Sequence, residues 1–347
     1  MNKKKILKPL KEVISVLNGE DIGYFPRAVL LNSPTVEMME SCNTFWPKAH
    51  YDAEAMAKLA CAIHRTTGFC ATNLPWDACV ELEALGGESS VGMGITDVPQ
   101  PKKAAYHCAD EVDIADDIFE RGRFPQVFHA VRLVKEKLKD DIPVVPLVEG
   151  PLNLSCLTIG INKVYKMMIK EKETVKRVLN IFSSFCIEYG NALLNCGGDV
   201  IQVSDPFAQG LTEKHFSEMM VPAYRKISDG IGGPVFLHIC GNSGKLLSSI
   251  PQTGFSAFSF DAPSVSTVQA RKIIGRRMQI IGSVPTVSHI LEGSEEDVFN
   301  ASVQCITDGV DLLSPSCALP PEAPLNNLKA MVKAISYYNE KYYGVTT

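Results

Sequence analysis

The sequence predicts an α/β fold, an eight-stranded (β/α) barrel of the TIM type. Two observations support it: short, β-branched apolar runs alternate with longer amphipathic segments, and eight such runs occur. Eight parallel strands are the number that this closed barrel requires. A doubly wound open sheet would produce the same alternation and is the alternative. The expected strands are residues 28–31, 69–73, 144–148, 200–203, 235–239, 257–260, 279–281 and 310–313.

The amphipathic segments between the runs have the length of crossover helices. Residues 80–124 depart from the alternation and contain four glycines near the segment TDVPQPKK, so we expect an irregular insertion beside the barrel. Residues 1–20 are expected to form a surface helix, and the whole of 1–347 a single domain. The expected crossover helices are residues 173–194, 213–227, 265–274, 295–307 and 324–338.

Composition and charge narrow the classes of partner. The chain has 46% hydrophobic residues, enough for a large core, and a net charge of −5 that argues against nucleic acid. No apolar stretch of about 18 residues occurs, so we expect no membrane span. The basic start is interrupted by Pro9 and Glu12 and does not resemble a signal peptide. The eleven cysteines are scattered, as in reduced cytoplasmic proteins, and cytoplasm is the expected location.

Polar residues collect where the expected strands end. Glu149 follows PVVPLV, Asp205 follows VIQVS, His238 and Cys240 close PVFLHIC, and Cys317 follows DLLSPS. In a barrel these positions meet at the carboxyl-terminal face, where active sites lie. Asp261 and Ser283 occupy equivalent positions.

His238, Cys240 and Cys317 have the chemistry of a zinc site. The strand period of two turns His238 and Cys240 to the same face, and barrel closure brings the end of the last strand to the same mouth. One imidazole and two thiolates suit zinc, and three protein ligands leave one position open, as in catalytic sites. The alternative is that the His-x-Cys pair is packed in the core.

Several segments resemble the methylcobamide:coenzyme M methyltransferases of the uroporphyrinogen decarboxylase-like superfamily. They are FWPKAHYDAEAMAKLACAIHRTTG, RGRFP, VEGPLNL, GGDVIQVSDP, HICGNSGKLL, IIGSV and DLLSPSCALPPEAPLNNLKAMVKA, in family order over nearly the whole chain. The resemblance implies an eight-stranded barrel, with zinc held by His238, Cys240 and Cys317. The decarboxylases carry an arginine-rich segment near the N-terminus, but the matching GYFPRAVLLNSP contains only Arg27, which disfavours porphyrinogen decarboxylation.

The resemblance also implies a reaction: a methyl group moves from a methylcobamide to a small-molecule thiol, most simply coenzyme M. The chain has no Asp-x-His-x-x-Gly cobalamin motif, so the corrinoid is expected on a partner protein. The alternative acceptor is tetrahydrofolate, which is not a thiol, or a thiol other than coenzyme M. More remote alternatives are a non-catalytic subunit and a decarboxylase-type enzyme.

Glu149 and Asp205 are the candidate catalytic carboxylates. Each could fill the open zinc position, orient His238 or bind a substrate group. The alternative is structural, since acidic residues at strand ends also cap helices and pair with basic neighbours.

Overall fold

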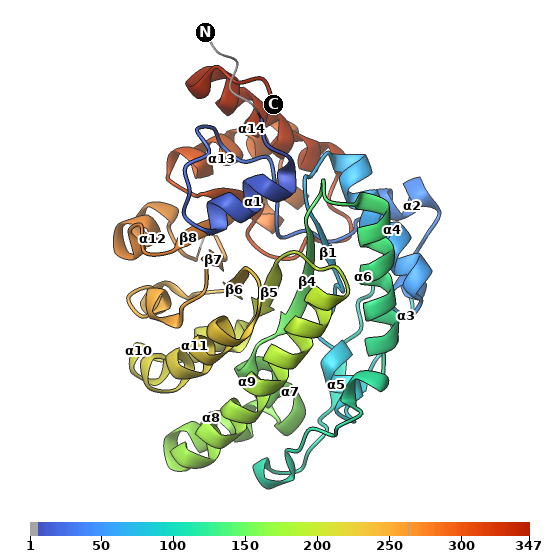
Figure 1. The fold of residues 1–347 in the computed structure, drawn as a ribbon, viewed down its shortest axis with the longest axis vertical. Helices are drawn as coiled ribbons and strands as arrows, with labels where there is room; N and C mark the ends of the chain where they lie inside the picture. Colours follow the sequence, from blue (N-terminus) through green and yellow to red (C-terminus); the bar gives the residue numbers. More distant parts are fainter. Residues whose placement is uncertain (1–5, 263) are drawn as a thin grey trace.

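In a computed structural model, which describes residues 6–262 and 264–347, a curled parallel sheet is surrounded by helices (Figure 1). The strand order is β1–β4–β5–β6–β7–β8–β9, and every neighbouring pair is parallel. Because the sheet is curled, the predicted barrel is confirmed and the alternative, a doubly wound open sheet, is wrong. The strands are β1 (Thr72–Leu74), β4 (Val144–Glu149), β5 (Ile201–Ser204), β6 (Val235–Ile239), β7 (Ala257–Phe260), β8 (Gln279–Val284) and β9 (Leu312–Pro315).

The expected strand at residues 28–31 is wrong in one respect. The segment is buried, but it belongs to no hydrogen-bonded ladder among the described residues. Side chains join it to its neighbours instead: Leu31 N donates to Ser314 Oγ at 3.0 Å, and Asn73 N donates to Asn32 Oδ1 at 3.1 Å. The segment therefore lies along the seam between β9 and β1 without extending the sheet.

The crossover helices cover the outside of the sheet. The expected helix 213–227 is divided into α10 (Glu213–His215), a π-helical turn (Phe216–Met220) and α11 (Val221–Gly230). The Ser294 hydroxyl and the Asp297 carboxylate cap the start of α13 (Glu295–Thr307) reciprocally. The other long helices are α4 (Ala53–Thr67), α6 (Phe124–Leu138), α7 (Pro151–Ile159), α8 (Ile161–Lys170), α9 (Lys172–Asn195), α12 (Thr267–Ile274) and α14 (Leu325–Tyr343).

The region expected to be irregular, residues 80–124, holds only short elements. They include α5 (Val80–Ala84), a two-stranded antiparallel pair of β2 (Glu88–Ser89) and β3 (Pro101–Lys103), and two 3₁₀ turns. Short helices α2 (Val36–Cys42) and α3 (Lys48–Tyr51) precede α4.

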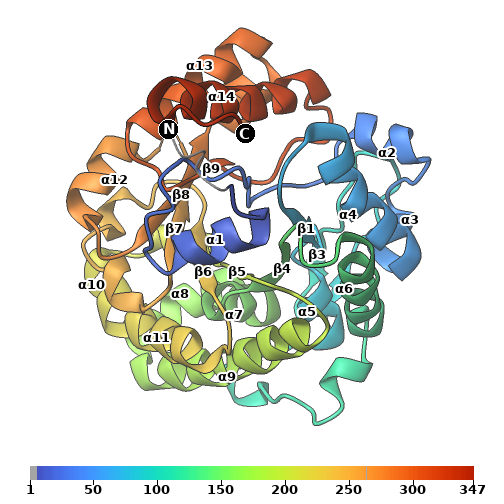
Figure 2. The same ribbon diagram turned by 45° about the horizontal axis from the view of Figure 1, so that its top comes forward.

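Helix α1 (Pro9–Leu17) closes the amino-terminal end of the barrel; Figure 2 shows it lying across that end. Its Val13, Val16 and Leu17 side chains are buried against apolar side chains from the strands, including Val145 and Phe236. The expectation of a surface helix holds only for the outer face of α1.

Glu12 attaches α1 to the chain that follows it. This buried carboxylate accepts hydrogen bonds from Arg27 Nε at 2.9 Å, Arg27 N at 2.9 Å and Tyr24 Oη at 3.0 Å. Arg27 thus helps to hold α1 in place at the amino-terminal end of the barrel.

None of the helices in the described part of the chain combines the length and apolar character needed to cross a bilayer.

We expect Glu12→Ala to lower the free energy of unfolding by about 2 to 4 kcal/mol, because it removes the partner of a half-buried guanidinium and two further hydrogen bonds. Urea denaturation measures this change. Glu20→Ala, at an exposed glutamate just after the same helix, should change it by less than about 0.5 kcal/mol. Equal effects of the two substitutions would contradict the anchoring role of Glu12.

Candidate metal centre

His238, Cys240 and Cys317 converge at the carboxyl-terminal end of the barrel. His238 lies in β6, Cys240 follows that strand, and Cys317 follows β9. His238 Nε2 lies 2.9 Å from Cys240 Sγ, which lies 3.2 Å from Cys317 Sγ. The sequence thus predicted correctly that these residues come together, although Cys240 and Cys317 are 77 residues apart.

The turn after Cys240 sets the direction of its side chain. Gly241 has φ +68°, and a Cβ atom there would overlap the Gln209 side chain. Both reasons favour glycine at this position. The Gly241 N–H donates to Asp261 Oδ2 at 3.3 Å, which ties the turn to the end of β7.

Ser259 orients the imidazole of His238. It is paired with His238 in the ladder between β6 and β7, and its Oγ lies 3.0 Å from His238 Nδ1. This contact directs Nε2 toward the two sulfur atoms. Ser259 was missed from the sequence, because only the register between the strands reveals that its side chain lies level with His238.

The two thiols differ in acidity because they share a hydrogen bond. The hydrogen bond to Cys317 and burial raise the pKa of Cys240. The same hydrogen bond lowers the pKa of Cys317 well below its ordinary value; burial opposes this effect, and the contact with His238 adds to it.

These residues fit a zinc ion. Within the described ranges, they are the group of three His, Cys, Asp or Glu residues whose ligand atoms all lie within 4.8 Å of one another. Atoms bound to one zinc ion at about 2.0 to 2.3 Å must lie at such short separations. One nitrogen and two sulfur donors form the borderline-soft set that zinc prefers.

A cavity of about 460 Å³ opens beside the three residues. It reaches from His238, Cys240 and Cys317 across the barrel mouth to the polypeptide after β1. The polar side chains on its wall include Asn32, Asn73, Asp77, Gln100, Glu149, Asn153, Gln202 and Gln209.

Glu149 lies on this cavity wall and is only 3% exposed. The Asn153 side-chain amide donates to its carboxylate, and the Glu149 N–H donates to Glu81 Oε1 at 2.9 Å. Burial, and then the neighbouring Glu81 carboxyl, raise the pKa of Glu149 well above its ordinary value.

Asp205 is fully buried and lies outside the set of residues that line the cavity. Its carboxylate accepts from Leu152 N at 3.1 Å and Asn153 N at 2.8 Å, so it caps the start of α7. Burial raises the pKa of Asp205 to about 7. The structure thus brings Glu149, but not Asp205, to the cavity, and Ser259 rather than either carboxylate contacts the His238 ring.

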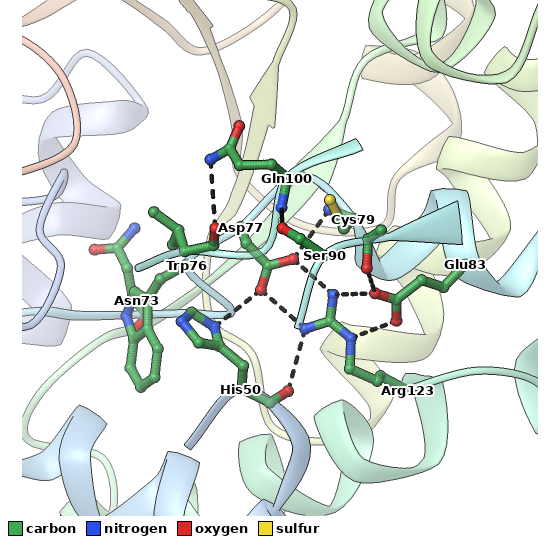
Figure 3. A network of polar contacts seen from close by, with 11 residues as sticks. His50, Asn73, Trp76, Asp77, Cys79, Glu83, Ser90, Gln100 and Arg123 are labelled. Carbon is green, nitrogen blue, oxygen red and sulfur yellow. Dashed lines mark hydrogen bonds and ion pairs between the residues drawn. The ribbon is translucent and has the colours of Figure 1, made fainter. Parts of the chain in front are cut away.

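A buried ionic network supports the opposite wall (Figure 3). Arg123 donates two hydrogen bonds to Asp77, of 2.6 and 2.9 Å, and two to Glu83, of 2.6 and 3.2 Å. His50 Nδ1 lies 3.0 Å from Asp77, and the His50 ring packs against Trp46 with the two ring centroids 4.7 Å apart and the rings tilted by 36°. Burial would raise the pKa of Asp77, but Arg123 and His50 hold it below its ordinary value. The sequence did not single out a functional role for the four charged or titratable members of this network, Arg123, Asp77, Glu83 and His50.

Glu81→Gln should become progressively stabilising relative to the native chain as pH rises. Burial raises the pKa of Glu81 from 4.5 to about 7, so its contribution to stability is complete below about pH 4.5 and is lost as pH rises through 7. We expect the variant to gain roughly 1 to 3 kcal/mol over the native chain between pH 5 and 8. Urea denaturation across this range measures the difference, and a constant difference would contradict the raised pKa.

Comparisons with known proteins identify the family and the fold of the chain. Residues 8–338 match the family Uroporphyrinogen decarboxylase (URO-D). The chain is 30% identical to a methylcobamide:CoM methyltransferase MtaA of Methanosarcina barkeri, over 96% of this chain and 97% of that one. It is also 30% identical to a methylated-thiol–coenzyme M methyltransferase of Methanosarcina mazei, over 94% and 89%.

A solved structure, described as a methyltransferase from Methanosarcina mazei, superimposes with a TM-score of 0.93 at 28% identity, covering 96% of this chain and 99% of that one. The fold and the family resemblance inferred from the sequence are confirmed. The chain belongs to the uroporphyrinogen decarboxylase family and, within it, to the methylcobamide:CoM methyltransferases.

Proposed function

We propose that this methyltransferase moves a methyl group from a methylated corrinoid protein to the sulfur of a small thiol held at a zinc site. The observation that carries the proposal is the convergence of His238, Cys240 and Cys317 at the edge of a cavity large enough for a substrate. The eleven free cysteines suit the reducing cytoplasm, where we place the reaction.

His238, Cys240 and Cys317 would hold the zinc ion, and Ser259 would keep the imidazole in the tautomer that directs Nε2 to the metal. A bound zinc ion would lower the pKa of the acceptor thiol and keep its sulfur deprotonated at neutral pH. The cavity wall would position the acceptor so that its sulfur faces the barrel mouth.

The proposed step is a nucleophilic displacement. The acceptor thiolate attacks the methyl carbon of the methyl-Co(III) corrinoid, a sulfur–carbon bond forms, and the carbon–cobalt bond breaks. The bonding electron pair stays on cobalt, which leaves as Co(I). The thiol proton is released when the acceptor binds, so no further reactant is needed.

Glu149 and Asp205 are proposed to act differently from each other. Glu149 would contact the substrate, because it lies on the cavity wall. Asp205 would act through position, because its carboxylate fixes the start of α7 and thereby Asn153, which contacts Glu149.

Coenzyme M is the first candidate acceptor, since the relatives from two Methanosarcina species are named as coenzyme M methyltransferases. Tetrahydrofolate is the second candidate. The assay below separates them.

We expect about one zinc ion per chain, and demethylation of methylcobalamin by the purified protein with coenzyme M. Cys240→Ala and Cys317→Ala should lower zinc content and reduce turnover more than about 100-fold, because each removes a ligand. Metal analysis and the absorbance of methylcobalamin measure both quantities. Cys42→Ala, at a free cysteine of α2, is the matched control and should leave both unchanged.

Turnover with tetrahydrofolate alone would transfer the proposal to the second acceptor. A protein with neither zinc nor turnover would refute the proposed site.

Ser259→Ala should weaken zinc binding by about 10- to 100-fold, because the imidazole loses the contact that orients it. Competition with a chelator measures the affinity. Ser259→Thr keeps the hydroxyl and should restore most of it. Unchanged affinity in the alanine variant would show that Ser259 does not orient the ligand.

A further inference from the structure

The cavity contains an amide pair one row of side chains below the three candidate ligands. Gln202 precedes Ser204 by two residues in β5, and Ser204 is paired with His238 in the ladder. Gln202 therefore points to the same side of the sheet as Ser204, about 7 Å deeper in the barrel. Its partner is Asn73 of β1, whose Nδ2 donates to Gln202 Oε1 at 3.1 Å.

The hydrogen-bonding capacity of this pair is only partly used. Asn73 and Gln202 line the cavity and are 4% and 8% exposed. Among the described residues, Asn73 Oδ1 has no hydrogen-bond partner, and no acceptor contacts Gln202 Nε2. When two side-chain amides share one hydrogen bond, the NH₂ group of one and the carbonyl oxygen of the other remain without a partner. This holds for either orientation of the two amides. Unused polar groups at this depth are costly without a ligand or water.

The backbone around Asn73 is held firmly. The Asn73 N–H donates to Asn32 Oδ1 at 3.1 Å, and its carbonyl accepts from Trp76 Nε1 at 2.8 Å. Asn73 is thus positioned before any ligand arrives, which lowers the entropic cost of binding.

The cavity wall offers hydrogen bonds but no positive side chain. In the part of the chain that the structure describes, its lining residues include neither lysine nor arginine. Arg123, behind Asp77, is already engaged by Asp77 and Glu83. At the amide pair an anionic substrate group would therefore meet uncharged donors, while the carboxyl groups of Asp77 and Glu149 lie elsewhere on the same wall.

We infer that the far end of the thiol acceptor is bound by the uncharged amide pair Asn73–Gln202, so the site selects acceptors by length and hydrogen bonding and not by negative charge. The inference rests on the proposed function. The length fits, since a two-carbon thiol spans about 4 to 5 Å from sulfur to terminal oxygen and a hydrogen bond adds about 3 Å. The substrate class is a two-carbon thiol that ends in an oxygen acceptor, whether sulfonate or hydroxyl.

The test compares thiols of equal length and different charge. With methylcobalamin as donor, kcat and KM are measured for 2-mercaptoethanesulfonate, 2-mercaptoethanol and cysteamine. We expect kcat/KM for the sulfonate and the hydroxyl compound to agree within about tenfold, and KM for the sulfonate to change less than about twofold between 50 and 500 mM salt. Cysteamine should respond least to the Gln202→Met substitution described next, because its ammonium group can donate to Asn73 Oδ1 but cannot accept from Gln202 Nε2.

Gln202→Met keeps the side-chain volume and removes the amide. We expect it to raise KM for the sulfonate and the hydroxyl compound about tenfold each, with kcat within twofold, because one hydrogen bond to the bound tail is lost. Gln269→Met, at an exposed glutamine on α12, is the matched control and should behave as the native chain. Thermal unfolding of each variant verifies that it is folded.

Calorimetric titration of the zinc-loaded protein with the three thiols, without a methyl donor, gives the same comparison as dissociation constants. It tests the amide pair even if methyl transfer is absent, an outcome that would refute the proposed function alone. A native preference for the sulfonate above about 100-fold, or sulfonate binding that is unchanged in Gln202→Met, would overturn the inference.

Discussion

The curl of the parallel sheet is the constraint on which the site depends. Strands β6 and β9 are separated by β7 and β8 in the sheet order, yet Cys240 and Cys317, which follow β6 and β9, have sulfur atoms 3.2 Å apart. An open sheet would hold two such strand ends more than about 14 Å apart, because neighbouring strands are about 4.8 Å apart. The candidate ligand set is therefore a product of the tertiary fold, and only its His-x-Cys half is encoded locally.

The features predicted from the sequence were those that follow from alternation and from strand ends. His238 and Cys240 share a face because the strand period is two, and Cys317 reaches them because all parallel strands end at the same face. The contact of Ser259 with His238 could not be predicted, because it depends on the register between β6 and β7, which no local sequence pattern encodes. The run at 28–31 has the composition of a strand, and composition does not reveal whether a partner ladder exists.

The buried ion pairs could not be predicted from the sequence either. Asp77 and Arg123 are 46 residues apart, and neither belongs to a motif that foretells their pairing. Asp205 shows the limit of reading strand ends, since its position after a strand made it a catalytic candidate, whereas its carboxylate is fully buried and does not line the cavity. Its contacts with Leu152 and Asn153 are those of a helix cap. A position at a strand end thus brings a residue to the carboxyl-terminal face of the barrel. Whether its side chain reaches the cavity depends on the packing around it.

Cys317, the third candidate ligand, follows β9, the strand that borders the seam. Residues 28–31 are joined to β9 by a serine hydroxyl, and Ser33 makes two further contacts, of 2.9 and 3.3 Å, with the backbone of Leu319, two residues after Cys317. A border fastened by hydroxyl groups separates at lower cost than a continuous backbone ladder. An ion bridging the end of β6 to the segment after β9 would hold in place the strand that borders this seam, so that occupancy of the metal site would also affect how firmly the ring is closed.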